Sequence, residues 1–174
     1  MKDVDLGGAR LIIRSAKGTK DRMVPLPQCV LGELEVQMRV ARTVWKGDVE
    51  AGLPVALPTA LARKYPKAPF AEPWAWGFPG HEAVKHPRTG QRVRFRMHEV
   101  NAQRAVRAAA AKVGIATRVT PHVLRLSYAT HAHASGAPAR DLQEVLGHGK
   151  RETTMRYLRP SFGIRSPLDA MAAE

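Results

Sequence analysis

Residues 121–157 read PHVLRLSYATHAHASGAPARDLQEVLGHGKRETTMRY, and they carry the clearest secondary-structure signals of the sequence. Proline fits the first turn of a helix, and glycine often follows the last turn because it adopts the left-handed cap without strain. Pro121 and Gly136 bound one helix-like segment, and Pro138 and Gly147 bound the next. The sequence therefore predicts helices over residues 121–135, 139–146 and 152–158.

Polar residues of this stretch recur in a spacing that suits phosphate chemistry. His122 and Arg125 stand three apart, on neighbouring positions of one helix face. The arginine fork suits two phosphate oxygens, and histidine can donate to a third or move a proton. Such a pair alone is most often an ordinary feature of a basic surface. The pair becomes more significant because Leu146-Gly147-His148 follows it in the sequence, and Tyr157 stands nine residues after His148.

The rest of the chain predicts a small sheet, two long helices and an irregular middle. Apolar residues at 9–15 and 22–26 flank the turn-like stretch KGTKD, which indicates a β-hairpin with a basic tip. Seven prolines interrupt residues 48–97, so little regular structure is expected there beyond a short helix at 59–65. Longer helices are predicted over residues 28–46, ending at Gly47, and over 98–113. The predicted fold class is α+β, mostly α, with one domain over residues 1–174.

Composition restricts the partners and the compartment. The chain of 174 residues carries a net charge of +13, which favours a polyanion such as nucleic acid over an ordinary basic surface. Cys29 is the only cysteine, so an internal disulfide and a cysteine-based zinc site are excluded, as is typical of a reducing cytosol. No run of about 18 apolar residues occurs, so no membrane span is predicted. These features predict a cytoplasmic protein.

The seven histidines raise the alternative of a zinc hydrolase. His81 and His86 lie five residues apart, whereas two zinc ligands on one helix face are four apart. His131 and His133 point to different faces of their predicted helix. Neither pair has a convincing third ligand, so no metal and no cofactor are predicted.

The ordered set of Lys17 at the hairpin tip, His122 with Arg125, His148 and Tyr157 resembles the catalytic domain of the tyrosine recombinases, the phage integrase superfamily. The resemblance covers nearly the whole chain. Two segments, 60–68 and 74–79, are similar to the helical insertion of integron integrases, here placed at residues 58–80. Further segments with this likeness are 86–90, 97–99 and the tail 163–169.

The resemblance implies site-specific DNA recombination through a tyrosine nucleophile. The hydroxyl of Tyr157 attacks a DNA phosphate, forms a 3′-phosphotyrosine and releases a 5′ hydroxyl. Arg125 binds the non-bridging oxygens, while His122 and His148 hydrogen-bond the phosphoryl group and assist proton movement. Lys17 protonates the leaving 5′ oxygen. A covalent intermediate conserves the phosphodiester energy, so this reaction requires no ATP, and fixed cations can stabilise the charge without a metal.

The resemblance also assigns contacts with DNA and with further copies of the chain. Integron integrases recombine cassettes at paired sites as tetramers, and they hold bases extruded from a folded single-stranded cassette site. Aromatic stacking suits that task, whereas the alternative for the same side chains is a small satellite core beneath a proline-rich loop. The predicted base-handling residues are Trp74, Trp76 and Pro79, and the predicted DNA-binding cations are Lys20, Arg22, Arg104 and Arg107.

Two departures from the family pattern predict impaired activity. The family's first catalytic arginine precedes the segment that resembles residues 1–6, and it has no counterpart in this sequence. The amino-terminal DNA-clasping domain of the family has no counterpart either. The chain is therefore expected to be a catalytic domain that lacks its N-terminal part, and the alternative function is a non-enzymatic DNA-binding remnant.

Overall fold

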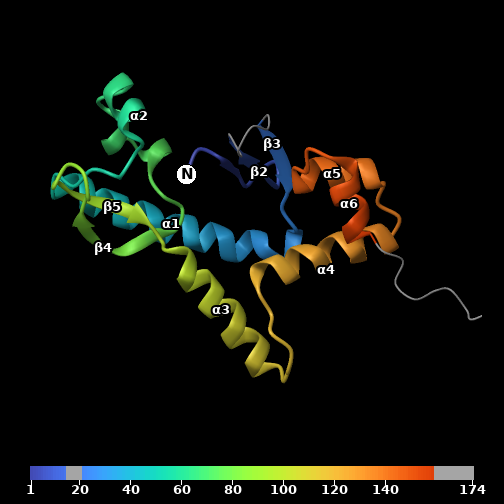
Figure 1. The fold of residues 1–174 in the computed structure, drawn as a ribbon. Coiled ribbons are helices and arrows are strands. Elements are labelled where there is room, and N and C mark those ends of the chain that lie inside the picture. Colours follow the sequence, from blue (N-terminus) through green and yellow to red (C-terminus); the bar gives the residue numbers. More distant parts are fainter. Residues whose placement is uncertain (15–20, 159–174) are drawn as a thin grey trace, which may run out of the picture. The chain divides into compact units, whose positions relative to one another are not determined.

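The computed structural model describes residues 1–14 and 21–158, apart from the side chain of Tyr157. The chain forms two compact units. The first comprises residues 1–14 and 23–105, and the described part of the second comprises residues 21–22 and 106–158 (Figure 1). Among the described residues, no helix is long and apolar enough to cross a membrane.

A three-stranded sheet lies near the start of the chain, in the order β1 (Val4–Asp5), β2 (Arg10–Ile13) and β3 (Arg22–Pro25). β2 and β3 confirm the two predicted strands. β1 was not predicted, because two residues are too few to show alternation. Asp5 closes the β1–β2 turn by accepting hydrogen bonds from Gly8 N at 2.8 Å and Arg10 Nε at 2.7 Å. These two donors, the Gly8 backbone first, hold the pKa of Asp5 below its ordinary value.

Helix α1 (Gln28–Glu50) is longer than the sequence predicted. The expectation that it ends at Gly47 is wrong. Glycine inside a helix costs only about 1 kcal/mol, so tertiary contacts can carry a helix across it. Asp48, the next residue, is buried and supplies such a contact. The helix is followed by Gly52, whose φ of +65° suits a glycine.

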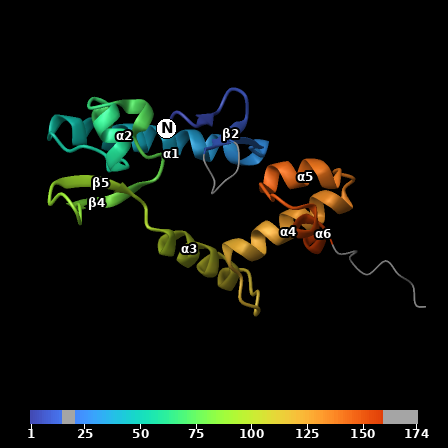
Figure 2. The same ribbon diagram turned by 45° about the horizontal axis from the view of Figure 1, so that its top comes forward.

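A second antiparallel pair, β4 (Pro79–Lys85) and β5 (Arg92–Arg96), lies within the stretch expected to be irregular (Figure 2). The predicted short helix is confirmed as α2 (Thr59–Lys64). The 3-10 helices η1 (Ala68–Phe70) and η2 (Glu72–Trp74) lie between α2 and β4. The β4–β5 hairpin was missed because Pro79 opens a strand instead of ending one, and β4 exposes neighbouring residues on both of its faces, which hides the alternation.

A buried ion pair joins α1 to this hairpin. Arg94 forms a fork with Asp48, with Nη2 2.6 Å from Oδ1 and Nε 2.8 Å from Oδ2. The two side chains are only 12% and 6% exposed. The Nη1 of Arg94 donates to the carbonyls of Gly80 and His81, at 3.0 and 2.9 Å. The Asp48 carboxylate raises the pKa of Arg94 above its ordinary value, against the effect of burial.

Replacing Asp48 with alanine is expected to lower the free energy of unfolding by about 3–5 kcal/mol, because it leaves a buried guanidinium without its counter-ion. The three tryptophans lie in the first unit, so urea unfolding followed by tryptophan fluorescence reports on it. Glu72→Ala is the matched control. It removes the more exposed ion pair with Arg42, and a loss under about 1 kcal/mol is expected. Equal losses in the two variants would contradict this account.

In the described part of the second unit, three helices pack around a small apolar core. They are α4 (Pro121–Ala134), α5 (Ala139–Leu146) and α6 (Arg151–Tyr157), drawn in orange and red in Figure 1. Helix α3 (Glu99–Lys112) precedes them. All four agree with their predicted ranges to within one residue at each end. The buried core residues are Ala129, Leu142, Leu146 and Leu158.

Candidate active site

The start of α4 positions His122 and Arg125. Thr120 caps the helix, because its Oγ1 accepts a hydrogen bond from Val123 N at 3.2 Å. Pro121 follows in the first turn, where its missing N–H costs nothing. His122 is exposed and Arg125 is half-buried one turn later. The helix start thus presents an imidazole and a guanidinium at the spacing the sequence predicted.

Arg125 reaches from α4 to the C-terminal end of α5. Its Nη2 donates to the carbonyl of Leu146. The last carbonyls of a helix lack partners within the helix and carry partial negative charge, so a guanidinium is favoured there. This contact holds Arg125 at the turn that follows α5.

That turn carries His148. Gly147 ends α5 with a φ of +68°, a left-handed cap that favours glycine. Gln143 then binds the backbone of His148 on both sides, its carbonyl accepting from His148 N at 3.1 Å and its Nε2 donating to His148 O at 3.0 Å. The His148 ring lies against α6, with Nδ1 3.1 Å from Oγ1 of the fully buried Thr154.

The electrostatic surroundings of His148 favour the neutral imidazole. Partial burial lowers its pKa below the ordinary value, and the positive charges of Arg125 and Arg22 lower it further. A neutral histidine can act both as hydrogen-bond donor and as acceptor, depending on the tautomer. The site therefore combines a fixed cation, Arg125, with an oriented imidazole, His148, whose neutral form is favoured.

The structure describes this predicted set in part. It brings Arg125 and His148 to the C-terminal end of α5, and it places His122 in the first turn of α4. Tyr157 is the last residue of α6, three residues after Thr154, and its side chain lies outside the described part. Lys17 and Lys20 also lie outside the described residues. Arg104 and Arg107 are exposed on α3.

Sequence reasoning did not assign a role to Thr154. Its contact with His148 depends on how the turn after α5 places the ring against α6. A threonine six residues after a histidine carries no signal of such a contact. Arg22 was expected to meet DNA, whereas its Nε donates to the carbonyl of Val145 at 3.3 Å.

The aromatic residues near η2 have partners within the first unit. The ammonium of Lys2 lies 2.9 Å from the centroid of the Trp74 ring, and the Tyr65 ring centroid is 6.5 Å from it. Trp76 Nε1 donates to the carbonyl of Arg94 at 3.2 Å. Pro79 opens β4 opposite Arg96. These contacts belong to a small packed cluster, so base stacking by these residues stays a prediction.

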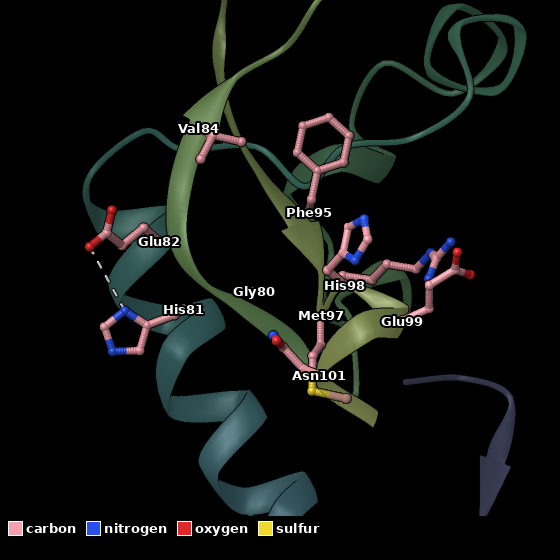
Figure 3. A pocket seen from close by; sticks show the side chains of 10 residues that line it. Gly80, His81, Glu82, Val84, Phe95, Met97, His98, Glu99 and Asn101 are labelled. Atoms are coloured by element: carbon pink, nitrogen blue, oxygen red, sulfur yellow. Dashed lines mark ion pairs between the residues drawn. The ribbon is translucent and has the colours of Figure 1, made fainter. Parts of the chain in front are cut away.

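A pocket of about 710 Å³ lies beside the β4–β5 hairpin. Figure 3 shows the side chains that line it. Val84 and Phe95 supply apolar side chains from the two strands, Glu99 is the first residue of α3, and His98 directly precedes it. His81 Nδ1 lies 3.9 Å from a carboxylate oxygen of Glu82, and both side chains are largely exposed. Among the described residues, no three His, Cys, Asp or Glu side chains gather closely enough to hold a metal ion.

The folded chain is similar to solved recombinase structures. It matches the crystal structure of a XerA recombinase with a TM-score of 0.57 and 25% identity, over 99% of this chain and 48% of that one. It also matches the Tn1549 transposon integrase, solved in complex with transposon right end DNA, with a TM-score of 0.50 and 16% identity, over 99% of this chain and 50% of that one. The second likeness concerns the fold alone. The fold is thus of the tyrosine recombinase catalytic class.

The chain belongs to the phage integrase family, whose model matches residues 1–163. An integrase/recombinase from Escherichia coli is 41% identical over 98% of this chain and 52% of its own length. The tyrosine recombinase XerA of Thermococcus kodakarensis is 29% identical over 89% of this chain and 41% of its own length. The chain therefore spans about half the length of the curated relatives it matches.

Proposed function

We propose that this chain cleaves and rejoins DNA strands in site-specific recombination, with Tyr157 as the nucleophile. The observation that carries the proposal is the convergence of Arg125 and His148 at the end of α5, where Thr154 joins His148 to α6. Tyr157 ends that same helix. A cation, an imidazole and a phenol on adjoining elements are the groups that phosphoryl transfer to tyrosine needs.

In the proposed step, one P–O bond forms as another breaks. The phenol oxygen of Tyr157 attacks the phosphorus and forms a new P–O bond, while the bond to the 5′ oxygen breaks. The phenol passes its proton to the imidazole of His148, whose neutral form is favoured, and the 5′ oxygen gains a proton, for which we propose Lys17 as the donor. Arg125 stabilises the charge on the non-bridging oxygens, and His122 and His148 hydrogen-bond the phosphoryl group. Attack by the 5′ hydroxyl of another strand reverses the step.

Cleavage is tested by incubation with a nicked recombination site. The short fragment beyond the cut diffuses away, so the adduct cannot be reversed and accumulates. A protein–DNA band that survives denaturing electrophoresis supports the proposal. Tight, salt-dependent binding without such a band supports the non-enzymatic DNA-binding remnant instead.

We propose slow cleavage by the 174-residue chain when it is tested alone. One of the family's two arginines has no counterpart among its residues, and loss of one transition-state donor costs about two to three orders of magnitude in rate. The adduct is therefore expected to build up over hours. We propose that a protein containing this domain acts as four subunits on two paired sites.

We further propose the integron type of recombination, with residues 58–80 as the insertion that handles extruded bases. Helix α2, η1 and η2 lie within this range. The half-buried rings of Trp74 and Trp76, together with Pro79, are the proposed base-handling groups. Binding of a folded single-stranded cassette site, compared with a matched duplex, tests this assignment: equal affinity for the two would contradict it.

We also propose where the chain acts. An enzyme of this type in a bacterium acts on nucleoid DNA in the cytoplasm.

Replacing Thr154 with valine is expected to slow adduct formation by about 10- to 100-fold, because His148 loses the hydroxyl that orients its ring. Valine matches the shape of threonine, so packing is largely kept. Single-turnover cleavage kinetics measure the effect. Thr154→Ser is the control that retains the hydroxyl and is expected to stay within a few-fold of the parent chain. A valine variant as fast as the serine variant would exclude this role for Thr154.

A further inference from the structure

Arg22 packs against the same turn that carries His148. It is the first residue of β3 and is half-buried. Its Nε donates to the carbonyl of Val145, one residue before the carbonyl that Arg125 binds. Two guanidinium groups from different elements thus bind consecutive carbonyls at the negative end of α5.

Gly147 makes room for this arginine. A methyl group added to Gly147 would lie 2.5 Å from Cζ and 2.6 Å from Nη1 of Arg22, far inside ordinary contact distance. The guanidinium therefore lies directly over the glycine. Glycine suits position 147 for two reasons. Its φ of +68° is left-handed, and the Arg22 side chain occupies the space that a side chain at this position would need.

We propose that Arg22 is a positioning residue, whose guanidinium fixes the turn bearing His148 through the Val145 carbonyl and the open face of Gly147. This inference rests on the proposed function, because it concerns the histidine that serves the phosphoryl group. It differs from the use expected from sequence, in which Arg22 binds the DNA backbone. A side chain that binds a helix end within its own unit has less freedom to follow a phosphate.

The position of Arg22 also has an electrostatic consequence. Among the described side chains, the charged groups acting on His148 are Arg125 from α4 and Arg22 from β3, while α6 contributes the uncharged Thr154. Burial lowers the pKa of His148, and both cations lower it further because they disfavour the imidazolium. Removing the charge of Arg22 is therefore expected to raise the pKa of His148, so that the ring stays protonated to a higher pH.

The test compares Arg22→Gln with the parent chain by NMR titration of the His148 ring, assigned with a His148→Asn variant. The pKa of His148 is expected to rise in Arg22→Gln and to stay near the parent value in Arg22→Lys, which keeps the charge. This readout requires neither DNA nor catalysis. An unchanged pKa in a folded Arg22→Gln variant overturns the inference. If that variant does not fold, an Arg22→Lys variant whose His148 resonances match the parent in shift and line width overturns it, because lysine lacks the planar fork.

DNA binding separates positioning from phosphate contact. A residue that binds a DNA phosphate changes the slope of log affinity against log salt by about 1 when its charge is removed. Arg22→Gln is expected to keep the parent slope and to slow adduct formation by about tenfold, with the inflection of the pH–rate profile moved to higher pH. Arg107→Gln, on the exposed face of α3, is the matched control, with a changed slope and an unmoved inflection. A slope change in Arg22→Gln contradicts the positioning role.

The two proposals fail in distinguishable ways. If the parent chain forms no covalent adduct, the proposed cleavage fails, and the NMR titration still decides whether Arg22 governs His148. If the adduct forms while Arg22→Gln leaves the titration, the rate and the pH inflection unchanged, cleavage stands and the role of Arg22 is refuted.

Discussion

Replacing Tyr157 with phenylalanine is expected to abolish the covalent protein–DNA complex, at least about a 10³-fold loss, because no other group of the site can form the phosphotyrosine. Phenylalanine keeps the ring and removes one oxygen, so folding and DNA affinity are expected to stay near those of the parent chain. The measurement is denaturing electrophoresis of protein incubated with nicked DNA. A gel shift under native conditions measures binding in the same samples.

Tyr128 supplies the matched control for this variant. It lies on α4 and is 45% exposed, and Tyr65, Tyr128 and Tyr157 are the only tyrosines of the chain. Tyr128→Phe makes the same chemical change and is expected to leave adduct formation intact. Full adduct formation by Tyr157→Phe, or its loss in Tyr128→Phe alone, would refute the assignment of the nucleophile.

Replacing Arg125 with lysine is expected to slow adduct formation by about 10²- to 10³-fold, the cost of one lost charge-stabilising donor. The charge is retained, so the expected loss comes from geometry. Arginine presents five N–H groups in a fixed plane, and this fork can bind the carbonyl of Leu146 and a phosphate together. A lysine ammonium is a single point charge. Single-turnover kinetics at saturating protein separate this effect from binding.

A loss of folding stability would also slow the Arg125→Lys variant, so the experiment includes two controls. Arg125 also stabilises the end of α5, so the unfolding of Arg125→Lys must be compared with that of the parent chain at the temperature of the assay. Arg107→Lys is the matched control for a conservative change on an exposed helix face, and it is expected to keep the parent rate. A folded Arg125→Lys variant with the parent rate would contradict the role of the guanidinium.

The helices of the second unit were predictable because their ends carry local signals. Pro121, Pro138 and Gly147 act on the backbone within a few residues of where they stand, so their effect is visible without the fold. The end of α1 and the β4–β5 hairpin were not predictable in this way. The burial of Asp48 against Arg94 overrides the weak helix propensity of Gly47, and that contact joins residues 46 positions apart.

The candidate site was likewise predictable only in its local sequence features. The residue types and order of His122, Arg125, His148 and Tyr157 were sufficient to suggest phosphoryl transfer on DNA. The fixation of Arg125 and His148 was not predictable, because it depends on contacts at a helix end. Arg125 binds a carbonyl 21 residues away and Arg22 one that is 123 residues away. Neither contact has a local sequence pattern.

DNA is expected to become attached to Tyr157. The attachment point is identified by trapping the adduct on nicked DNA, digesting both components and sequencing the nucleotide-bearing peptide by mass spectrometry. We expect a nucleotide linked through its 3′ phosphate to Tyr157, within the peptide that follows Arg156 or Arg151. Attachment to Tyr65, Tyr128 or a non-tyrosine residue, or the absence of any modified peptide after prolonged incubation with bound DNA, would contradict it.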